Sequence, residues 1–125
     1  MTTTISPVLH YADLEKAVEY LKETFGFTEK AVHRDPDGNA VYAELRLDDC
    51  GVGVGQTSPE PSVFDLGPAV FYVALDDVDA MHSRVAATGA EIVMPLVDQD
   101  YGSREFAMRD YENNVWCFGT FRAGS

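Results

Sequence analysis

The sequence contains the same arrangement of segments twice, and this duplication constrains the fold more than any other feature. The clearer copy covers 98–121, DQDYGSREFAMRDYENNVWCFGTF, a pattern typical of a strand, a tight turn and a second strand. A weaker copy covers 34–56, and each copy follows a helical segment that opens with an aspartate. Two small curved sheets placed side by side enclose a cavity, so we expect a fold that binds small molecules.

In the first half, local signals predict one helix and four strands. Asp13 is a suitable N-cap, the apolar residues that follow recur at helical spacing, and Gly26 stands where a left-handed helix end is expected. Asp35-Pro36-Asp37-Gly38 is a strong turn signal. The strands are predicted over 8–11, 27–34, 40–47 and 52–56.

The second half repeats this order. Asp76 or Asp77 caps the helix and Gly89 ends it, while strands are predicted over 69–74, 91–96, 103–109 and 115–121. When Asp13 is aligned with Asp77, two βαβββ units result, about 5–57 and about 68–122, joined by the proline-containing segment 57–68. We predict one α+β domain over 1–125, with curved mixed sheets around a cavity and the helices on the outer face.

Length and composition are those of an ordinary globular domain. The 125 residues are 46% hydrophobic and 24% charged, and no apolar run approaches the roughly 20 residues that cross a bilayer. The start, MTTTISPVLHY, lacks a basic segment followed by an apolar one, so we expect no secretory signal. Cys50 and Cys117 are too few for a disulfide scaffold. We therefore expect a cytoplasmic protein.

The net charge of −12 restricts the partners. It argues against nucleic acid, whose phosphates require a basic face, and against anionic membranes. Two interpretations stay open: the charge serves solubility alone, or it favours cationic ligands.

Motifs spread over nearly the whole chain match one known family: Tyr11-Ala-Asp-Leu-Glu-Lys-Ala, Phe25-Gly26-Phe27, Ala43-Glu44-Leu45, Asp76-Asp77-Val78-Asp79, Gly89-Ala90-Glu91, and Tyr101-Gly102-Ser103-Arg104-Glu105-Phe106 with Asp110, Asn114, Trp116 and Gly119. By these motifs the chain resembles the vicinal oxygen chelate superfamily, which includes glyoxalase I, extradiol dioxygenases, fosfomycin-resistance enzymes and bleomycin-resistance proteins. The resemblance specifies a fold more than a function, because most of these residues shape turns and strands.

The resemblance implies a place for a divalent metal ion, with one ligand position on each of four strands. These positions fall near Ser6, near Val54 or Gly55, at Val70 and at Cys117. None carries the imidazole or carboxylate that such an ion prefers. We therefore expect neither a metal nor another cofactor.

The same strand parity identifies candidate ligand-binding residues. His10 shares the face of Ser6 and is either a ligand contact or a packed histidine, and Tyr72 shares the face of Val70. Cys117 occupies a metal position itself. Glu44 and Arg104 are charged residues inside strands. Arg104 either forms a structural ion pair with Glu44 or Glu105 or anchors a polar ligand.

These residues favour a small-molecule binding protein of the glyoxalase/bleomycin-resistance type that lacks the usual metal site and sequesters a cationic or aromatic compound. The alternative is a metal-dependent lyase, isomerase or dioxygenase-like enzyme with displaced ligands, for which His10 and Glu44 would be the minimum. A third alternative is an interaction domain that has lost its ligand. The expected partners are a small-molecule ligand and a second copy in a homodimer, with no nucleic acid and no membrane.

Overall fold

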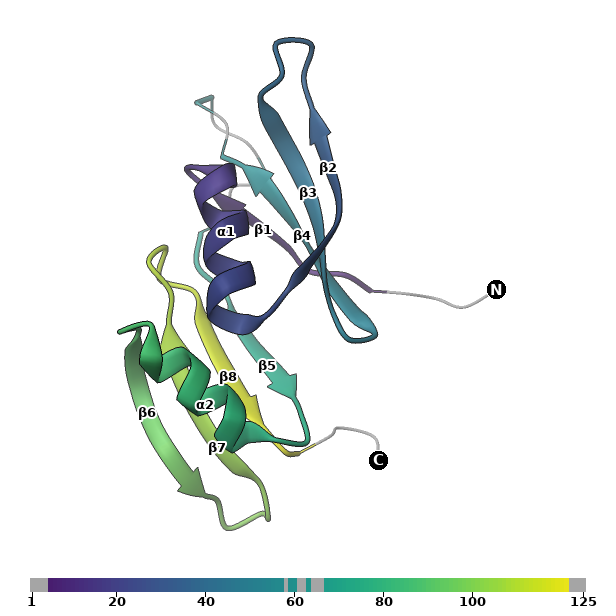
Figure 1. The fold of residues 1–125 in the computed structure, drawn as a ribbon. Coiled ribbons are helices and arrows are strands. Elements are labelled where there is room, and N and C mark those ends of the chain that lie inside the picture. The colour runs from purple at the N-terminus through teal and green to yellow at the C-terminus, as the bar shows by residue number, and fades with distance from the viewer. Residues whose placement is uncertain (1–4, 58, 61–62, 64–66, 122–125) are drawn as a thin grey trace. The chain divides into compact units, whose positions relative to one another are not determined.

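The computed structural model describes residues 5–57, 59–60, 63 and 67–121 (Figure 1). The chain divides into two compact units, Met1–Gly67 and Pro68–Ser125. Each unit contains one helix and a four-stranded mixed sheet in the order βαβββ. The predicted α+β class with two βαβββ repeats is confirmed. Neither helix is long and apolar enough, within the described residues, to cross a membrane.

The first unit has the sheet order β1-β4-β3-β2, in which β1 is parallel to β4 and the other pairs are antiparallel. Asp13 caps the helix by accepting a hydrogen bond from the Lys16 backbone N–H at 3.2 Å, and Gly26 ends it at a φ of 88°. The elements are β1 (Val8–Tyr11), α1 (Leu14–Phe25), β2 (Thr28–Arg34), β3 (Ala40–Leu47) and β4 (Cys50–Gln56).

The second unit repeats this topology, with the sheet order β5-β8-β7-β6. Of the two predicted caps, Asp77 is the N-cap, because its side chain accepts a hydrogen bond from the Ala80 backbone N–H at 2.9 Å. Gly89 follows the helix at a φ of 77°. The elements are β5 (Val70–Ala74), α2 (Val78–Ala87), β6 (Glu91–Asp98), β7 (Arg104–Arg109) and β8 (Val115–Gly119).

The turns that precede β3 and β8 share the same hydrogen bonds, although they join different strand pairs of the two units. In both turns the aspartate N–H donates to the carbonyl of the asparagine four residues later, at 2.9 Å for Asp35 and Asn39 and at 2.9 Å for Asp110 and Asn114. In both, the aspartate Oδ1 accepts from that asparagine's N–H, at 2.9 Å and 3.0 Å. The second turn is tied to the core as well, because the Trp116 indole donates to Asp110 Oδ2 at 3.0 Å.

In each unit the helix covers one face of its own sheet, and the apolar core of the unit lies between that helix and that sheet. In the second unit the rings of Phe106 and Phe118 stack at 5.2 Å, and Trp116 packs against Phe71 at 4.8 Å. These residues alternate along their strands with residues that point to the opposite side. We call that opposite side, which the unit's own helix does not cover, the open face.

Six strand boundaries differ from the sequence prediction by one or two residues, and two of these differences have a clear local reason. β4 begins at Cys50 rather than at residue 52, because Asp48, at a φ of 55°, allows a turn so short that Leu47 pairs directly with Cys50. β8 ends at Gly119 rather than at residue 121, since its last partner on β7 is Glu105.

Candidate functional site

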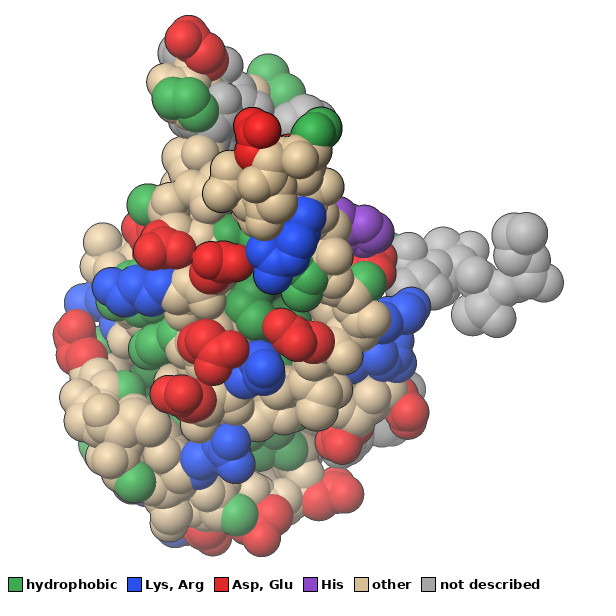
Figure 2. Space-filling view, turned by 45° about the horizontal axis from the view of Figure 1, so that its top comes forward, with side chains coloured by type: hydrophobic (Ala, Val, Ile, Leu, Met, Phe, Trp, Pro, Cys, Tyr) green, Lys and Arg blue, Asp and Glu red, His purple; other side chains and the backbone are tan. Residues whose placement is uncertain are grey.

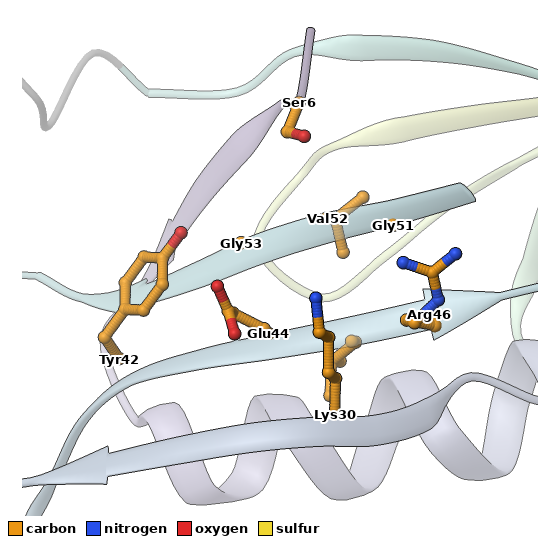
Figure 3. Close-up of a pocket in the computed structure, with 9 residues that line it drawn as sticks. Ser6, Lys30, Tyr42, Glu44, Arg46, Gly51, Val52 and Gly53 are labelled. Carbon is orange, nitrogen blue, oxygen red and sulfur yellow. The ribbon is translucent and has the colours of Figure 1, made fainter. Parts of the chain in front are cut away.

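The open face of the first unit carries a small pocket. Side chains from β2 and β3 extend to the same side of the sheet, toward the glycine-rich strand β4 (Figure 3). The pocket has a volume of about 100 Å3, which is below the roughly 300–1,000 Å3 of a drug-sized site. It is lined by Ser6, Lys30, Tyr42, Glu44, Leu45, Arg46, Gly51, Val52 and Gly53.

Two glycines of β4 allow aromatic side chains to lie directly on the sheet. A Cβ at Gly53 would clash with the Tyr42 hydroxyl, and a Cβ at Gly55 would come within 2.8 Å of the His10 ring. Tyr42 also lies beside His33, with ring centroids 6.0 Å apart. The open face of this unit therefore presents a phenol and an imidazole on a bare backbone, a surface suited to planar groups.

On the open face of the second unit, a buried carboxylate is the centre of a hydrogen-bonded cluster. Glu105 is only 3% exposed, although it is a charged residue. Its Oε1 accepts from the Tyr101 hydroxyl at 2.6 Å, and its Oε2 accepts from the Tyr72 hydroxyl at 3.0 Å. Ser103 Oγ lies 3.2 Å from the Tyr72 hydroxyl. We call Tyr72, Tyr101, Ser103 and Glu105 the Glu105 cluster.

The hydrogen bonds of this cluster set the protonation of its members. Burial alone would raise the pKa of the Glu105 carboxyl, but hydrogen bonds from Tyr101, Ser103, Tyr72 and Gln99 outweigh burial, and the pKa lies below its usual range. The bond to Glu105 raises the pKa of Tyr101 to about 12. Burial first, and then the bond to Glu105, raise the pKa of Tyr72. At neutral pH the cluster is therefore a carboxylate solvated by two neutral phenols.

Cys117 lies beside the cluster but is not activated. It pairs with Tyr72 across the parallel β5–β8 ladder. Burial, and to a lesser degree the charge of Glu105, raise the pKa of its thiol. A thiol with a raised pKa stays protonated at neutral pH and is a poor nucleophile, so this arrangement does not support thiol catalysis.

The second open face has a largely apolar rim around the Glu105 cluster. Tyr101 is 61% exposed and meets Phe121 edge to face, with ring centroids 6.1 Å apart. Val70 and Tyr72 are exposed on β5 as well. At the floor, a Cβ at Gly119 would clash with the Tyr72 hydroxyl, so a glycine is required for the tyrosine to reach Glu105.

Four of the five predicted ligand-binding residues lie on the open faces. His10 and Glu44 lie on that of the first unit, Tyr72 and Cys117 on that of the second. Arg104 requires a correction. It shares the parity of Phe106, which must face the core, and its guanidinium bonds to Asp79 of α2 at 3.0 Å and to Asp98 at 3.2 Å, not to Glu44 or Glu105.

The positions implied for a metal lie as follows. Ser6 lines the first pocket, and Val70 and Cys117 share the open face of the second unit. Val54 is fully buried under α1, so it does not reach the open face. In the second unit Cys117 pairs with Tyr72. In the first unit Val8 stands at the position of Tyr72 and pairs with Gly53, so Gly53 is the residue equivalent to Cys117. Among the residues that the structure describes, no group of three His, Cys, Asp or Glu could hold a metal ion.

The most connected residues of the site were missing from the sequence prediction. Tyr101 and Ser103 precede β7 in a turn whose path no periodic pattern reveals. Glu105 could have been placed, because the segment Arg104–Arg109 alternates and its apolar members Phe106 and Met108 identify the core face. Tyr42 could have been recognised in the same way from the alternation in β3.

Comparisons with known proteins identify a family and several similar proteins. The model of the Glyoxalase/Bleomycin resistance protein/Dioxygenase superfamily matches residues 5–118. An uncharacterized protein of Mycobacterium bovis is 28% identical over 123 residues, which cover 92% of this chain and 81% of that protein. The structure of TioX from Micromonospora sp. ML1 is 31% identical, with a TM-score of 0.79, over 93% of this chain and 98% of that one.

A likeness to an enzyme of this group concerns the fold alone. Lactoylglutathione lyase from Agrobacterium tumefaciens has a TM-score of 0.72 over 95% of this chain and 93% of that chain, but only 19% of the residues are identical. At that identity, the catalytic residues of the lyase do not transfer to this chain.

Proposed function

Since the chain belongs to the glyoxalase/bleomycin resistance protein/dioxygenase superfamily, we propose that it is a small-molecule binding protein of that type which works without the usual metal centre. Its ligand is a cationic or aromatic compound held against the open faces of the sheets. A cytoplasmic location is part of the proposal, and the two free thiols of Cys50 and Cys117 are in keeping with a reducing compartment.

The observation that carries the proposal is the position of Tyr42. Its hydroxyl fills the space above Gly53, the residue equivalent to Cys117 in the first unit. A metal-ligating side chain at this position would have to displace Tyr42. The phenol instead lines a pocket together with Glu44, Lys30 and Arg46 (Figure 3). These groups offer stacking and hydrogen bonds, which are the interactions of a ligand site.

The donor chemistry of the implied metal positions supports the same proposal. A serine, a valine or a glycine, a second valine and a protonated thiol stand at Ser6, at Val54 or Gly55, at Val70 and at Cys117. Hard and borderline divalent ions prefer imidazole and carboxylate ligands, so this set does not fit such an ion.

The surface charge supports a cationic ligand in a general way. Acidic and basic side chains lie interspersed over the face shown in Figure 2, rather than in one patch. On this face the net charge of −12 is therefore not gathered at one site, and it attracts cations in general. Selectivity has to come from a particular group on an open face.

A thermal-shift screen tests the proposal. Purified protein is heated with divalent metals and with a set of cationic and neutral aromatic compounds. We expect organic compounds to raise the melting temperature, and metals to leave it unchanged. Stabilisation by a divalent metal, with no organic compound acting in its absence, would favour the alternative enzyme, in which His10 and Glu44 would be displaced ligands on the first open face.

A homodimer completes the proposal. Each sheet ends in edge strands, β1 and β2 in one unit and β5 and β6 in the other, and exposed edges are commonly covered by a second copy. Light scattering at micromolar concentration should give twice the monomer mass of 13.7 kDa. A monomer mass would refute this part of the proposal without affecting ligand binding.

A further inference from the structure

Glu105 carries a buried negative charge. Among the residues that the structure describes, none of the ion pairs includes it. Arg104, its neighbour in sequence, points to the other side of the sheet and bonds to Asp79. A buried carboxylate is costly unless it is paired or hydrogen-bonded, and here neutral hydrogen-bond donors, the hydroxyls of Tyr72, Tyr101 and Ser103 and the side chain of Gln99, stabilise the charge. Within the described residues, no ion pair cancels the field of this charge at the open face.

The two phenols transmit this charge to the surface. Tyr72 and Tyr101 each donate their single hydroxyl proton to Glu105, so both phenol oxygens are left as acceptors. The Tyr72 oxygen accepts from the Phe121 backbone N–H at 3.1 Å. The described part of the chain supplies no donor to the Tyr101 oxygen. An exposed oxygen polarised by a buried carboxylate attracts a positively charged group.

The rim provides the second element of a cation site. The exposed rings of Tyr101 and Phe121 meet edge to face beside this acceptor, and Tyr72 adds a third ring. The electron-rich faces of such rings attract organic cations, and desolvation strengthens the attraction. Val70 extends the rim with an apolar side chain that would contact the hydrocarbon part of a ligand.

We propose that the Glu105 cluster, with Phe121 and Val70 at its rim, is the binding site for an organic ammonium ion that carries an aromatic or hydrocarbon group. This inference rests on the proposed small-molecule binding function and names its ligand class. The buried charge disfavours an anion, and a neutral aromatic compound gains stacking alone. A hydrated inorganic cation cannot use the apolar rim, so the site selects organic cations.

Benzyltrimethylammonium chloride is a suitable probe, with benzyl alcohol as the neutral comparison and benzoate as the anionic one. Binding to the intact protein is followed by calorimetry and by amide NMR shifts at low salt. We expect the ammonium compound to bind most tightly and to move the resonances of Tyr72, Tyr101 and Phe121. Glu105→Gln, which keeps the shape of the side chain, should weaken its binding roughly tenfold or more and leave benzyl alcohol unaffected.

Glu15→Gln on the exposed surface of α1 is the matched control, because it changes the net charge equally but lies in the other unit. If both variants lost binding of the ammonium compound equally, the net negative charge of the molecule and not the Glu105 cluster would attract the compound, and the proposal would be overturned. The proposal would also be overturned if Glu105→Gln bound the ammonium compound unchanged, or if the amide NMR shifts were confined to the pocket of the first unit that Tyr42 lines. If Tyr101→Ala changes the mass in light scattering, the rim is an interface between copies, and the proposal is likewise wrong.

The same experiment separates this inference from the function on which it rests. If neutral or anionic compounds bind an open face while the ammonium probe does not, the ligand class is wrong and the binding function stands. If no compound in the thermal-shift screen binds, both are wrong.

Discussion

Tyr101 donates its hydroxyl proton to Oε1 of Glu105 across 2.6 Å, from a turn to a neighbouring strand only four residues away. The bond is short because its acceptor is charged and buried. It orders an exposed tyrosine at the edge of an open face and holds a carboxylate ionised where water does not reach it. The features of the second unit that suit a ligand depend on this contact.

The alkaline titration of Tyr101 tests the contact directly. The pKa of Tyr101 is raised from the ordinary value of 10.0 to about 12, and the hydrogen bond to Glu105 is the main cause. The phenolate absorbance of Tyr101 should therefore appear near pH 12. It is identified as the part of the absorbance that is missing in Tyr101→Phe. Because the folded-state pKa is raised, the stabilising contribution of the bond is present below pH 10 and is lost as the pH rises toward 12. In Glu105→Gln the titration should move toward 10, and an unchanged titration would show that the bond is absent.

Trp116→Ala should destabilise the fold rather than a ligand site. The indole is 1% exposed, lies on the helix side of β8 and donates to Asp110 Oδ2 at 3.0 Å. Losing a buried aromatic side chain costs about 3–5 kcal/mol. Denaturant unfolding measures this loss, with Val41→Ala as an exposed control that should change little. Loss of ligand binding at an unchanged melting temperature would mean that the two faces of β8 have been exchanged.

The two aspartate turns with the same backbone hydrogen bonds offer a matched pair of substitutions. Asp110→Ala removes an acceptor that is buried and serves the Asn114 backbone and the Trp116 indole, whereas Asp35→Ala removes the same turn bonds at an exposed site. We expect Asp110→Ala to cost about 1–3 kcal/mol more than Asp35→Ala, because it leaves a buried indole N–H without its acceptor. Thermal unfolding compares the two variants, and equal costs would contradict the coupling of the second turn to the core.

Two glycines on the open faces test which face holds the ligand. A Cβ at Gly119 would clash with the Tyr72 hydroxyl and come within 2.7 Å of Glu105 Cγ, while a Cβ at Gly53 would clash with Tyr42. Gly119→Ala should therefore weaken the binding of benzyltrimethylammonium, and Gly53→Ala should not. Calorimetric titration of both variants decides this. The reverse order would place the cation site in the first unit.

Local signals were sufficient to predict the fold. The caps Asp13 and Asp77, the left-handed glycines Gly26 and Gly89, and the alternation along β3 all act within a few residues, so they are legible in the sequence. The face of Arg104 could not be fixed from sequence, because a charged residue inside a strand can point to either side of the sheet. The face is decided by Phe106, which has to be buried.

The Glu105 cluster could not be assembled from sequence for a different reason. Its members come from β5, from the turn before β7 and from β7 itself, and Tyr72 lies 33 residues from Glu105. The contact exists because only β8 separates β5 from β7 in the sheet, and because Gly119 leaves room for the tyrosine to cross β8. Strand order and the space above one glycine are tertiary properties, which periodicity does not encode.

The central claim is that the protein binds an organic ligand without a resident metal. The direct test is a calorimetric titration with the best compound from the thermal-shift screen, performed on protein stripped with a chelator and repeated after addition of one equivalent of a divalent metal. The account predicts the same dissociation constant in both titrations. Binding that disappears on stripping and returns with the metal would contradict it.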